Sequence, residues 1–240
     1  MLEDGSYLST FVPSVSPGLA PGPGLDALNA AAVLYLSDSL STLDKKNPTV
    51  VDLFPWIRGQ LNKATTEAIY GKKNPFRDPA VQEAWYAFEP LIMVHMLKAW
   101  PSVIARKSLR AREQILIPAF ERYFAQDGHL QGSVLAQGRY EHNTSHGLRG
   151  RDVAATEIGQ LVASLVNSVG SAFWMVYHIF SDSSVLSDCR NEVERLVQQD
   201  DDGTCTLDLS MLKSSCPVLM STWQETLRRY CHDRYAGPAY

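Results

Sequence analysis

A set of small and polar residues at helical spacing could hold a bulky ligand close to the backbone. Its members lie three or four positions apart, which places them on one face of a helix: Ala163, Val166, Asn167, Gly170 and Ser171. A glycine in mid-helix costs about 1 kcal/mol relative to alanine, so Gly170 needs an explanation. A flat cofactor that packs against this face is one explanation.

These residues belong to a long apolar stretch, residues 152–180, which reads DVAATEIGQLVASLVNSVGSAFWMVYHIF. No Lys or Arg occurs in it, and Glu157 is its last acid. Apolar residues surround the predicted helix on every side, so we expect it to be buried.

Two other interpretations of this helix stay open. It could be the central helix of a soluble helical domain, in which Gly170 accommodates a neighbouring helix. The 23 uncharged residues 158–180 could also cross a bilayer. Several polar side chains within the stretch, and the acids that follow it, oppose a membrane span.

Three further groupings could do chemistry by residue type. His142 and His146 are four apart, but no Glu lies between them in the metalloprotease arrangement, and we do not expect a metal site. Glu225 and Arg228 have the spacing of a surface ion pair. The basic cluster in residues 106–112 lacks interleaved aromatics and is interpreted as a solvated face, with no nucleic-acid binding.

Composition sets the class of protein. The chain has 240 residues, of which 45% are hydrophobic and 10% aromatic, enough for one large or two small globular domains. A net charge of −4 gives no general attraction to nucleic acid. The cysteines lack zinc-ligand spacing and are interpreted as reduced thiols: Cys189, Cys205, Cys216 and Cys231. The first residues show neither a signal peptide nor a membrane anchor.

Helical periodicity and its interruptions predict a mainly α-helical chain. Residues 1–24 are expected to be an irregular N-terminal segment, because 11–24 contain four prolines and three glycines. Asp26 is the predicted cap of the first helix. Other predicted boundaries are Gly71 as a helix end, helix starts near Val51, Ala80, Arg106 and Pro217, a kink at Pro90 and a cap at Ser184.

Four stretches, in order, carry a resemblance to a known family: ATTEAIYGKKNPFRDP, LVASLVNSVGSAFWMVYHIF, VLSDCRNEV and LKSSCPVLMSTWQETLRR. They resemble helix E, the long helix I, helix J and the Glu-x-x-Arg helix K of the haem-thiolate monooxygenases, cytochrome P-450. The likeness is to fungal members that group with sterol and bile-acid hydroxylases and prostacyclin synthase. It implies a partial cytochrome P-450 fold over residues 25–240, from about helix C/D to helix K, with helix I at its centre.

By this resemblance, helix I crosses the distal face of a haem. Ala163, Val166, Asn167 and Gly170 would line the cofactor, and Asn167, Gly170 and Ser171 would lie where oxygen and substrate meet the iron. Most members place an acid and a threonine here to deliver protons, and the matching residues in this chain are Val169 and Gly170.

The sterol-hydroxylase and prostacyclin-synthase group departs from that pattern. It shows an Asn, a proline three residues later, and then Phe-Trp. The chain keeps Asn167, Phe173 and Trp174 but has Gly170 instead of the proline. We therefore expect Asn167, Ser171 or water to deliver protons, and an isomerase-like reaction without external electrons stays an alternative.

The resemblance also assigns roles to residues outside helix I. Met93, Met96 and Leu97 would line a lipophilic substrate, although core packing is an equal alternative for the methionines. Glu225 and Arg228 would be structural. The connection between helices F and G would touch the membrane surface through Trp100, Pro101, Val103 and Ile104.

The implied enzyme is a membrane-associated monooxygenase on the cytosolic face of the endoplasmic reticulum. It would insert one oxygen atom from O2 into a steroid, terpenoid or other secondary metabolite, with electrons from an NADPH-dependent flavoprotein reductase. Cys231 lacks the Phe-x-x-Gly-x-x-x-Cys-x-Gly context of the haem ligand. We therefore expect an internal fragment that is inactive alone. A haem-free helical remnant or interaction module is the first alternative, and a single-span membrane protein is the second.

Overall fold

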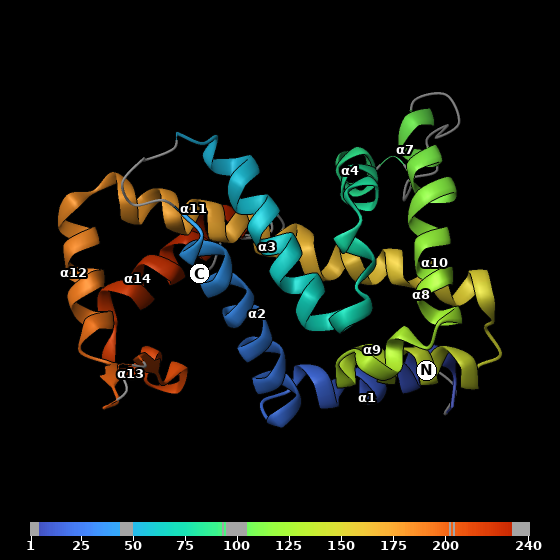
Figure 1. The fold of residues 1–240 in the computed structure, drawn as a ribbon, viewed down its shortest axis with the longest axis horizontal. Coiled ribbons are helices and arrows are strands. Elements are labelled where there is room, and N and C mark those ends of the chain that lie inside the picture. Colours follow the sequence, from blue (N-terminus) through green and yellow to red (C-terminus); the bar gives the residue numbers. More distant parts are fainter. Residues whose placement is uncertain are drawn as a thin grey trace, which may run out of the picture. The chain divides into compact units, whose positions relative to one another are not determined.

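The computed structural model describes residues 5–43, 50–92, 94, 105–201, 203 and 205–231 (Figure 1). These residues are mostly helical, which confirms the predicted fold class. The chain divides into two compact units, and each is described by itself. The first comprises Met1–Asp52 and Arg58–Val166, and the second comprises Leu53–Ile57 and Asn167–Tyr240.

The first unit is built of α-helices joined by short 3-10 turns. Its elements in chain order are α1 (Tyr7–Leu19), α2 (Pro23–Ser41), α3 (Leu53–Tyr70, whose first residues belong to the second unit), η1 (Gly71–Lys73), η2 (Pro75–Arg77), α4 (Pro79–Phe88), η3 (Glu89–Leu91), α7 (Arg106–Ala111), the π-helical η4 (Arg112–Leu116), α8 (Ile117–Ala125), η5 (Gly128–Gln131), α9 (Val134–Ser145), α10 (Gly150–Leu161) and the π-helical η6 (Val162–Val166).

The irregular segment predicted for residues 1–24 is wrong. Residues 7–19 form α1, with Pro13 and Pro17 inside it, although a proline in a helix interior costs about 3 kcal/mol. Tertiary packing outweighs that cost, since α1 lies along α9 so closely that a Cβ on Gly18 would be 2.7 Å from the Cβ of Leu135. Asp26 is not a cap either, because α2 begins at Pro23 and places Asp26 in its first turn.

Several predicted boundaries are confirmed. Gly71 ends α3 with a φ of 65°, the left-handed region that glycine adopts without strain. The helix predicted from Ala80 begins one residue earlier, where the side chain of Asp78 accepts a hydrogen bond from the backbone N–H of Ala80 (2.9 Å). It gives way to a 3-10 turn at Pro90, where a kink was predicted.

The core of the first unit includes buried residues of α4, η4, α8, α10 and η6. Its largest members are fully buried, among them Trp85, Phe120 and Leu161. Aromatic rings meet edge to face, with the Tyr70 and Phe120 centroids 5.1 Å apart. This core holds the first half of the long apolar helix in place.

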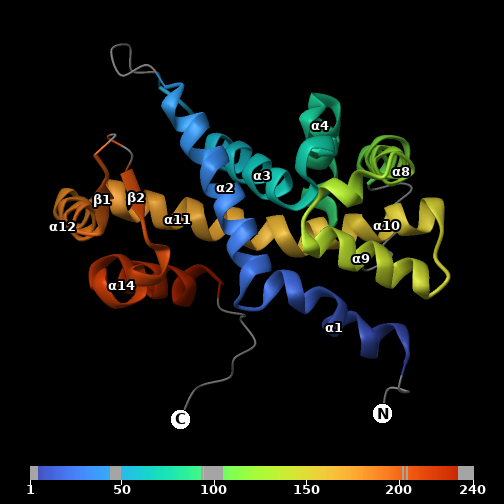
Figure 2. The same ribbon diagram turned by 60° about the horizontal axis from the view of Figure 1, so that its bottom comes forward.

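The second unit surrounds the other half of that helix. Its elements are α11 (Asn167–Ser181), α12 (Ser183–Glu194), β1 (Val197–Gln199), β2 (Cys205–Leu207), η7 (Leu209–Met211), α13 (Leu212–Ser215), α14 (Pro217–Thr226) and the π-helical η8 (Leu227–Cys231). The antiparallel hairpin β1–β2 pairs Gln198 with Thr206, and Figure 2 shows it beside α12 and α14.

Side-chain carboxylates cap the helices of the second unit. Asp182, not the predicted Ser184, caps α12, because its Oδ1 accepts the backbone N–H groups of Ser184 (2.9 Å) and Val185 (3.2 Å). An aspartate oxygen one residue outside the helix reaches two free N–H groups at once, whereas Ser184 already lies inside. α14 begins at Pro217, as predicted.

Candidate functional site on the central helix

The helix predicted over residues 152–180 runs without interruption over Gly150–Ser181. Its α-helical hydrogen bonding changes to the wider π pattern at Val162–Val166, a segment that contains the predicted site residues Ala163 and Val166. Such π segments inside α-helices are frequent at functional sites. No residue type or spacing in the sequence marked this one, so sequence reasoning missed it.

The expected complete burial of this helix is wrong. Only 28% of its most apolar 18-residue window is buried in the described structure. The first half buries Val153, Ile158 and Leu161, but Gly159 and Ala163 are exposed. Hydropathy shows that a side chain favours burial, but it does not show that the same chain supplies a covering partner. By length and hydropathy alone, the helix could also span a membrane.

The predicted site residues divide by their environment. In the first unit Ala163 is exposed and Val166 half-buried; in the second, Asn167 is exposed and Gly170 half-buried. Ser171 is only 6% exposed, and its hydroxyl donates to the backbone carbonyl of Asn167 (2.9 Å). Ser171 therefore differs from Ala163 and Asn167 in exposure, and the role predicted for these residues stays a prediction. A serine in an apolar helix commonly bonds the carbonyl four residues before it.

The helix leaves its backbone open at two glycines. A Cβ built on Gly159, in the first unit, would meet no described atom within 4 Å, and the same holds for Gly170 in the second. Beside Gly170, the exposed amide of Asn167 offers both a donor and an acceptor. The second half of the helix can therefore receive a bulky group near a polar side chain.

Aromatic contacts fix α11 within the second unit. The rings of Trp174 and Tyr230 stack with centroids 4.2 Å apart and planes within 4° of parallel. The Tyr230 hydroxyl also lies 2.9 Å from Nε2 of His178. Phe173 meets Phe54 edge to face at 5.3 Å. The Phe-Trp pair that marked the family resemblance therefore packs against neighbouring elements and orients the helix.

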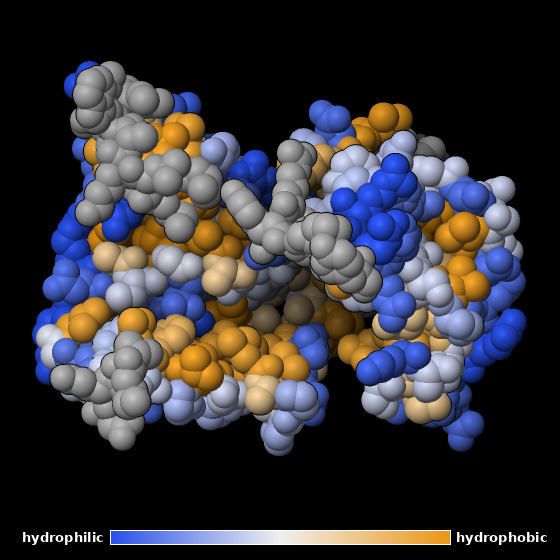
Figure 3. All heavy atoms as spheres, turned by 180° about the vertical axis from the view of Figure 1, so that it is seen from behind, coloured by the Kyte–Doolittle hydropathy of each residue, from blue (hydrophilic) through white to orange (hydrophobic). Residues whose placement is uncertain are grey.

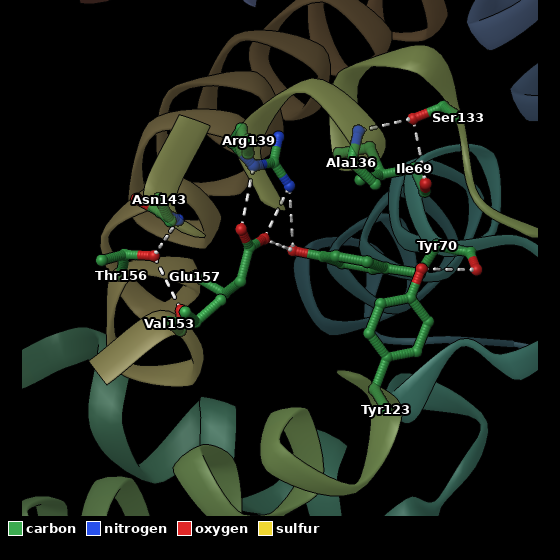
Figure 4. A network of polar contacts seen from close by, with 10 residues as sticks. All are labelled: Ile69, Tyr70, Tyr123, Ser133, Ala136, Arg139, Asn143, Val153, Thr156 and Glu157. Atoms are coloured by element: carbon green, nitrogen blue, oxygen red, sulfur yellow. Dashed lines mark hydrogen bonds and ion pairs between the residues drawn. The ribbon is translucent and has the colours of Figure 1, made fainter. Parts of the chain in front are cut away.

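A buried ion pair fixes the first half of the helix (Figure 4). The Arg139 guanidinium donates to both carboxylate oxygens of Glu157, from Nε at 3.0 Å and from Nη2 at 2.6 Å. The Tyr70 hydroxyl donates to the same carboxylate at 2.9 Å. Burial, and then the charge of Glu157, raise the pKa of Tyr70 well above its ordinary value. The three side chains join α3, α9 and α10.

Sequence reasoning missed this cluster, although a signal was present. Glu157 is the last acid of an otherwise apolar helix, and it shares a face with Val153, Ala154 and Leu161. A carboxylate on a buried face requires a buried cation. The sequence did not show which cation, because Arg139 lies 18 residues away on another helix.

The two histidines form a hydrogen-bond clamp. Nε2 of His142 lies 3.0 Å and Nε2 of His146 lies 2.9 Å from the Thr10 hydroxyl oxygen. Since that hydroxyl donates its proton to the carbonyl of Ser6 (2.9 Å), both rings donate to Thr10 through Nε2–H. Burial, and then the neighbouring His146, lower the pKa of His142. The clamp joins α9 to α1.

Glu225 and Arg228 form the exposed ion pair that their spacing predicted. Nε of Arg228 donates to Oε2 of Glu225 at 2.7 Å, a second guanidinium nitrogen donates to Oε1, and the side chains are 66% and 56% exposed. The hydrogen bond from Arg228 lowers the pKa of Glu225. The structural role of this pair stays a prediction. The other predicted residues lie outside the described part of the chain: Met93, Met96, Leu97, Trp100, Pro101, Val103 and Ile104.

Two curated proteins are similar to the chain over most of its length. The cytochrome P-450 monooxygenase nodJ of Hypoxylon pulicicidum is 32% identical over 212 residues, which are 86% of this chain and 41% of that protein. The chain is homologous to the cytochrome P-450 monooxygenases. A cytochrome P-450 monooxygenase of Gibberella zeae is 26% identical over 204 residues, or 84% of this chain and 39% of that protein.

The predicted family of fungal cytochrome P-450 monooxygenases is thus confirmed, while the sterol-hydroxylase and prostacyclin-synthase group stays a prediction. The chain matches no protein-family profile. It spans about 41% and 39% of the length of these two cytochrome P-450 relatives.

A haem fits this cytochrome P-450 homologue only in part. Gly170 leaves the backbone open and Asn167 is exposed, as the wall beside a flat macrocycle requires. The described cysteines do not have the environment of a thiolate ligand. Cys189 and Cys216 are buried, and burial together with the charge of Glu192 raises the pKa of both thiols. Cys205 is exposed on the hairpin strand β2.

Proposed function

We propose that this chain belongs to a cytochrome P-450 monooxygenase that oxidises a lipophilic substrate. Its helix Gly150–Ser181 lines the side of the haem on which oxygen binds, and we call this helix the wall of the site. The observation that carries the proposal is the half-open apolar helix Gly150–Ser181, in a chain homologous to two fungal monooxygenases. Haem, when bound, supplies oxygen activation at its iron. The helix positions ligands beside it and excludes water from one side.

The residues of the wall have separate tasks in this proposal. Ala163 and Gly170 keep side-chain bulk away from the macrocycle. The Asn167 amide donates a hydrogen bond to an oxygen-bearing ligand or holds a water that relays protons. The Ser171 hydroxyl already donates its proton to a backbone carbonyl. Asn167 is therefore better placed than Ser171 to donate a hydrogen bond to a ligand or a water.

We extend the proposal to the whole enzyme. Its substrate is a steroid, terpenoid or other secondary metabolite, lined in part by Met93, Met96 and Leu97. An NADPH-dependent flavoprotein reductase supplies the electrons. The enzyme lies on the cytosolic face of the endoplasmic reticulum and touches the membrane through residues 100–104. The two relatives, both cytochrome P-450 monooxygenases, support the oxygen-insertion chemistry, and the other assignments follow from the family resemblance.

This chain alone is proposed to be inactive, because burial raises the pKa of the Cys189 and Cys216 thiols and Cys231 lacks the sequence context of the family's haem ligand. Haem titration of the purified chain tests this point. We expect no Soret band at the thiolate–CO position, and such a band would show that the chain ligates haem by itself. Absence of any haem uptake, in the chain and in the chimera described next, would favour the haem-free remnant.

A chimera tests the wall directly. The matching segment of the Hypoxylon relative is replaced by this chain, and the ferrous–CO spectrum and substrate turnover are measured. We expect a thiolate–CO band, which Gly170→Leu weakens by filling the open space. The matched control is Ser187→Leu, at an exposed position on α12.

The chimera has two informative negative results. If Gly170→Leu leaves both the spectrum and turnover unchanged, the helix does not border the cofactor. If the parent chimera turns over without reductase, the isomerase-like alternative is favoured. Recovery of the isolated chain in the soluble fraction after alkaline washing excludes the single-span alternative.

A further inference from the structure

Three cations on α7 have no ion-pair partner among the described carboxylates. Arg106, Lys107 and Arg110 are exposed within one and a half turns of helix. The next cation, Arg112, is paired with Glu113. Several other arginines of this unit are paired with carboxylates, as in Arg77 with Glu67, Arg58 with Glu89, and Arg151 with Glu113 and Glu121. Three neighbouring cations on one short helix therefore give this surface a local excess of positive charge.

A groove of about 320 Å³ lies beside these cations, between α4 and the helix formed by α7 and η4. Figure 1 shows α4 next to α7. Small apolar side chains line much of it: Ala80, Ala84, Ala87 and Ala111. Lys107 and Arg110 also line it, opposite the carboxylate of Glu83, and Ile115 is 37% exposed at the same groove. The groove thus combines a shallow apolar floor with an excess of positive charge.

We infer that this face of α7 binds an anionic membrane surface, with phosphate-bearing headgroups against Arg106, Lys107 and Arg110 and lipid carbon over the alanine floor. Charge complementarity carries the inference, since each Lys or Arg held near an anionic bilayer adds favourable binding energy. Nucleic acid fits less well, because residues 105–116 contain no aromatic side chain that could stack on bases, whereas the alanine floor of the groove suits lipid carbon. The inference deepens the membrane contact in the proposed function and adds a preference for lipid charge.

Vesicle binding by the full chain tests the inference. Cosedimentation is measured with phosphatidylcholine vesicles and with vesicles that also contain phosphatidylserine, at low and high salt. The test variant carries Arg106→Gln, Lys107→Gln and Arg110→Gln. The matched control removes the same charge from exposed cations of the second unit through Arg190→Gln, Arg195→Gln and Lys213→Gln. Circular dichroism compares the helix content of all three proteins.

We expect the natural chain to prefer the phosphatidylserine vesicles and to lose that preference at high salt. The α7 variant should bind them on the order of 100-fold more weakly, and the control variant should bind like the natural chain. Arg106→Lys with Arg110→Lys should retain the preference, because charge and not guanidinium geometry is required.

Three results would overturn the inference, and they can be told apart. Equal loss in the α7 and control variants would mean that net charge acts without a site. Equal binding of the natural chain to both vesicle types would leave the proposed membrane contact standing but remove the role of α7. No binding to either vesicle type would count against both.

Discussion

Arg139 and Glu157 provide the sharpest test of the energetics of this chain. Both side chains are almost fully buried, at 2% and 1% exposed, and Arg139 makes two charged hydrogen bonds to Glu157. Removal of one partner leaves an uncompensated buried charge, which costs about 3 to 5 kcal/mol. A typical domain has only about 5 to 15 kcal/mol of stability, so Arg139→Met should remove a large part of it.

The assay is urea unfolding followed by circular dichroism, with the midpoint compared among the natural chain and four variants. Arg139→Met and Glu157→Met should each lower the midpoint strongly. The double variant should be more stable than either single variant, because an apolar pair of similar volume leaves no buried charge. Arg77→Met is the control, since its pair with Glu67 is 57% exposed on the arginine side and is worth about 0 to 1 kcal/mol.

Two results would refute this reasoning. If Arg139→Met costs no more than Arg77→Met, the buried pair does not carry the expected electrostatic weight. If the double variant is as unstable as the sum of the two single changes, the cost comes from lost packing and not from an unpaired charge.

The remaining predictions concern pH, close packing and capping. The pKa of His142 in the folded chain is lowered from 6.5, so the unfolded chain binds a proton at a higher pH than the folded chain does. The free energy of unfolding should therefore fall as pH drops below about 6.5. His142→Gln should make it depend less on pH, as measured by urea titrations. Gly18→Ala should destabilise α1 by about 1 to 3 kcal/mol, because its Cβ would meet the backbone of α9, and proteolysis of α1 should accelerate. Gly59→Ala, which meets nothing closer than 3.9 Å, should stabilise by about 1 kcal/mol. The Glu192 carboxylate accepts hydrogen bonds from two backbone N–H groups of α14, and Glu192→Gln should weaken them and lower the thermal midpoint. Glu194→Gln, at an exposed position, should leave the midpoint unchanged. Equal midpoints for the two variants would contradict the capping role of Glu192.

Local rules failed at the N-terminus because a tertiary contact opposed them. Four prolines and three glycines within 11–24 indicated an irregular chain, yet α1 persists along α9. The same contact explains the clamp at Thr10, whose partners His142 and His146 are 132 and 136 residues away. Neither the helix nor the clamp follows from spacing within the segment.

The site on the central helix stays a prediction, and the sequence did not show which of its residues are buried. The spacing of Asn167, Gly170 and Ser171 places them on one face of a helix, and the resemblance to the monooxygenases predicts that this face borders the haem. Ser171 is buried because other parts of the folded chain cover it, and the local sequence does not show which parts these are.

The sequence by itself determined the approximate bounds of the long helix, the end of α3, the start of α14 and the family. These depend on residues close together in the chain, such as the glycine that ends α3 and the proline that begins α14. Only the tertiary structure decided that Glu157 meets Arg139 and Tyr70, which lie 18 and 87 residues away. A buried charge has one requirement, an opposite charge within reach, and the packing of α3, α9 and α10 selects which residue meets it.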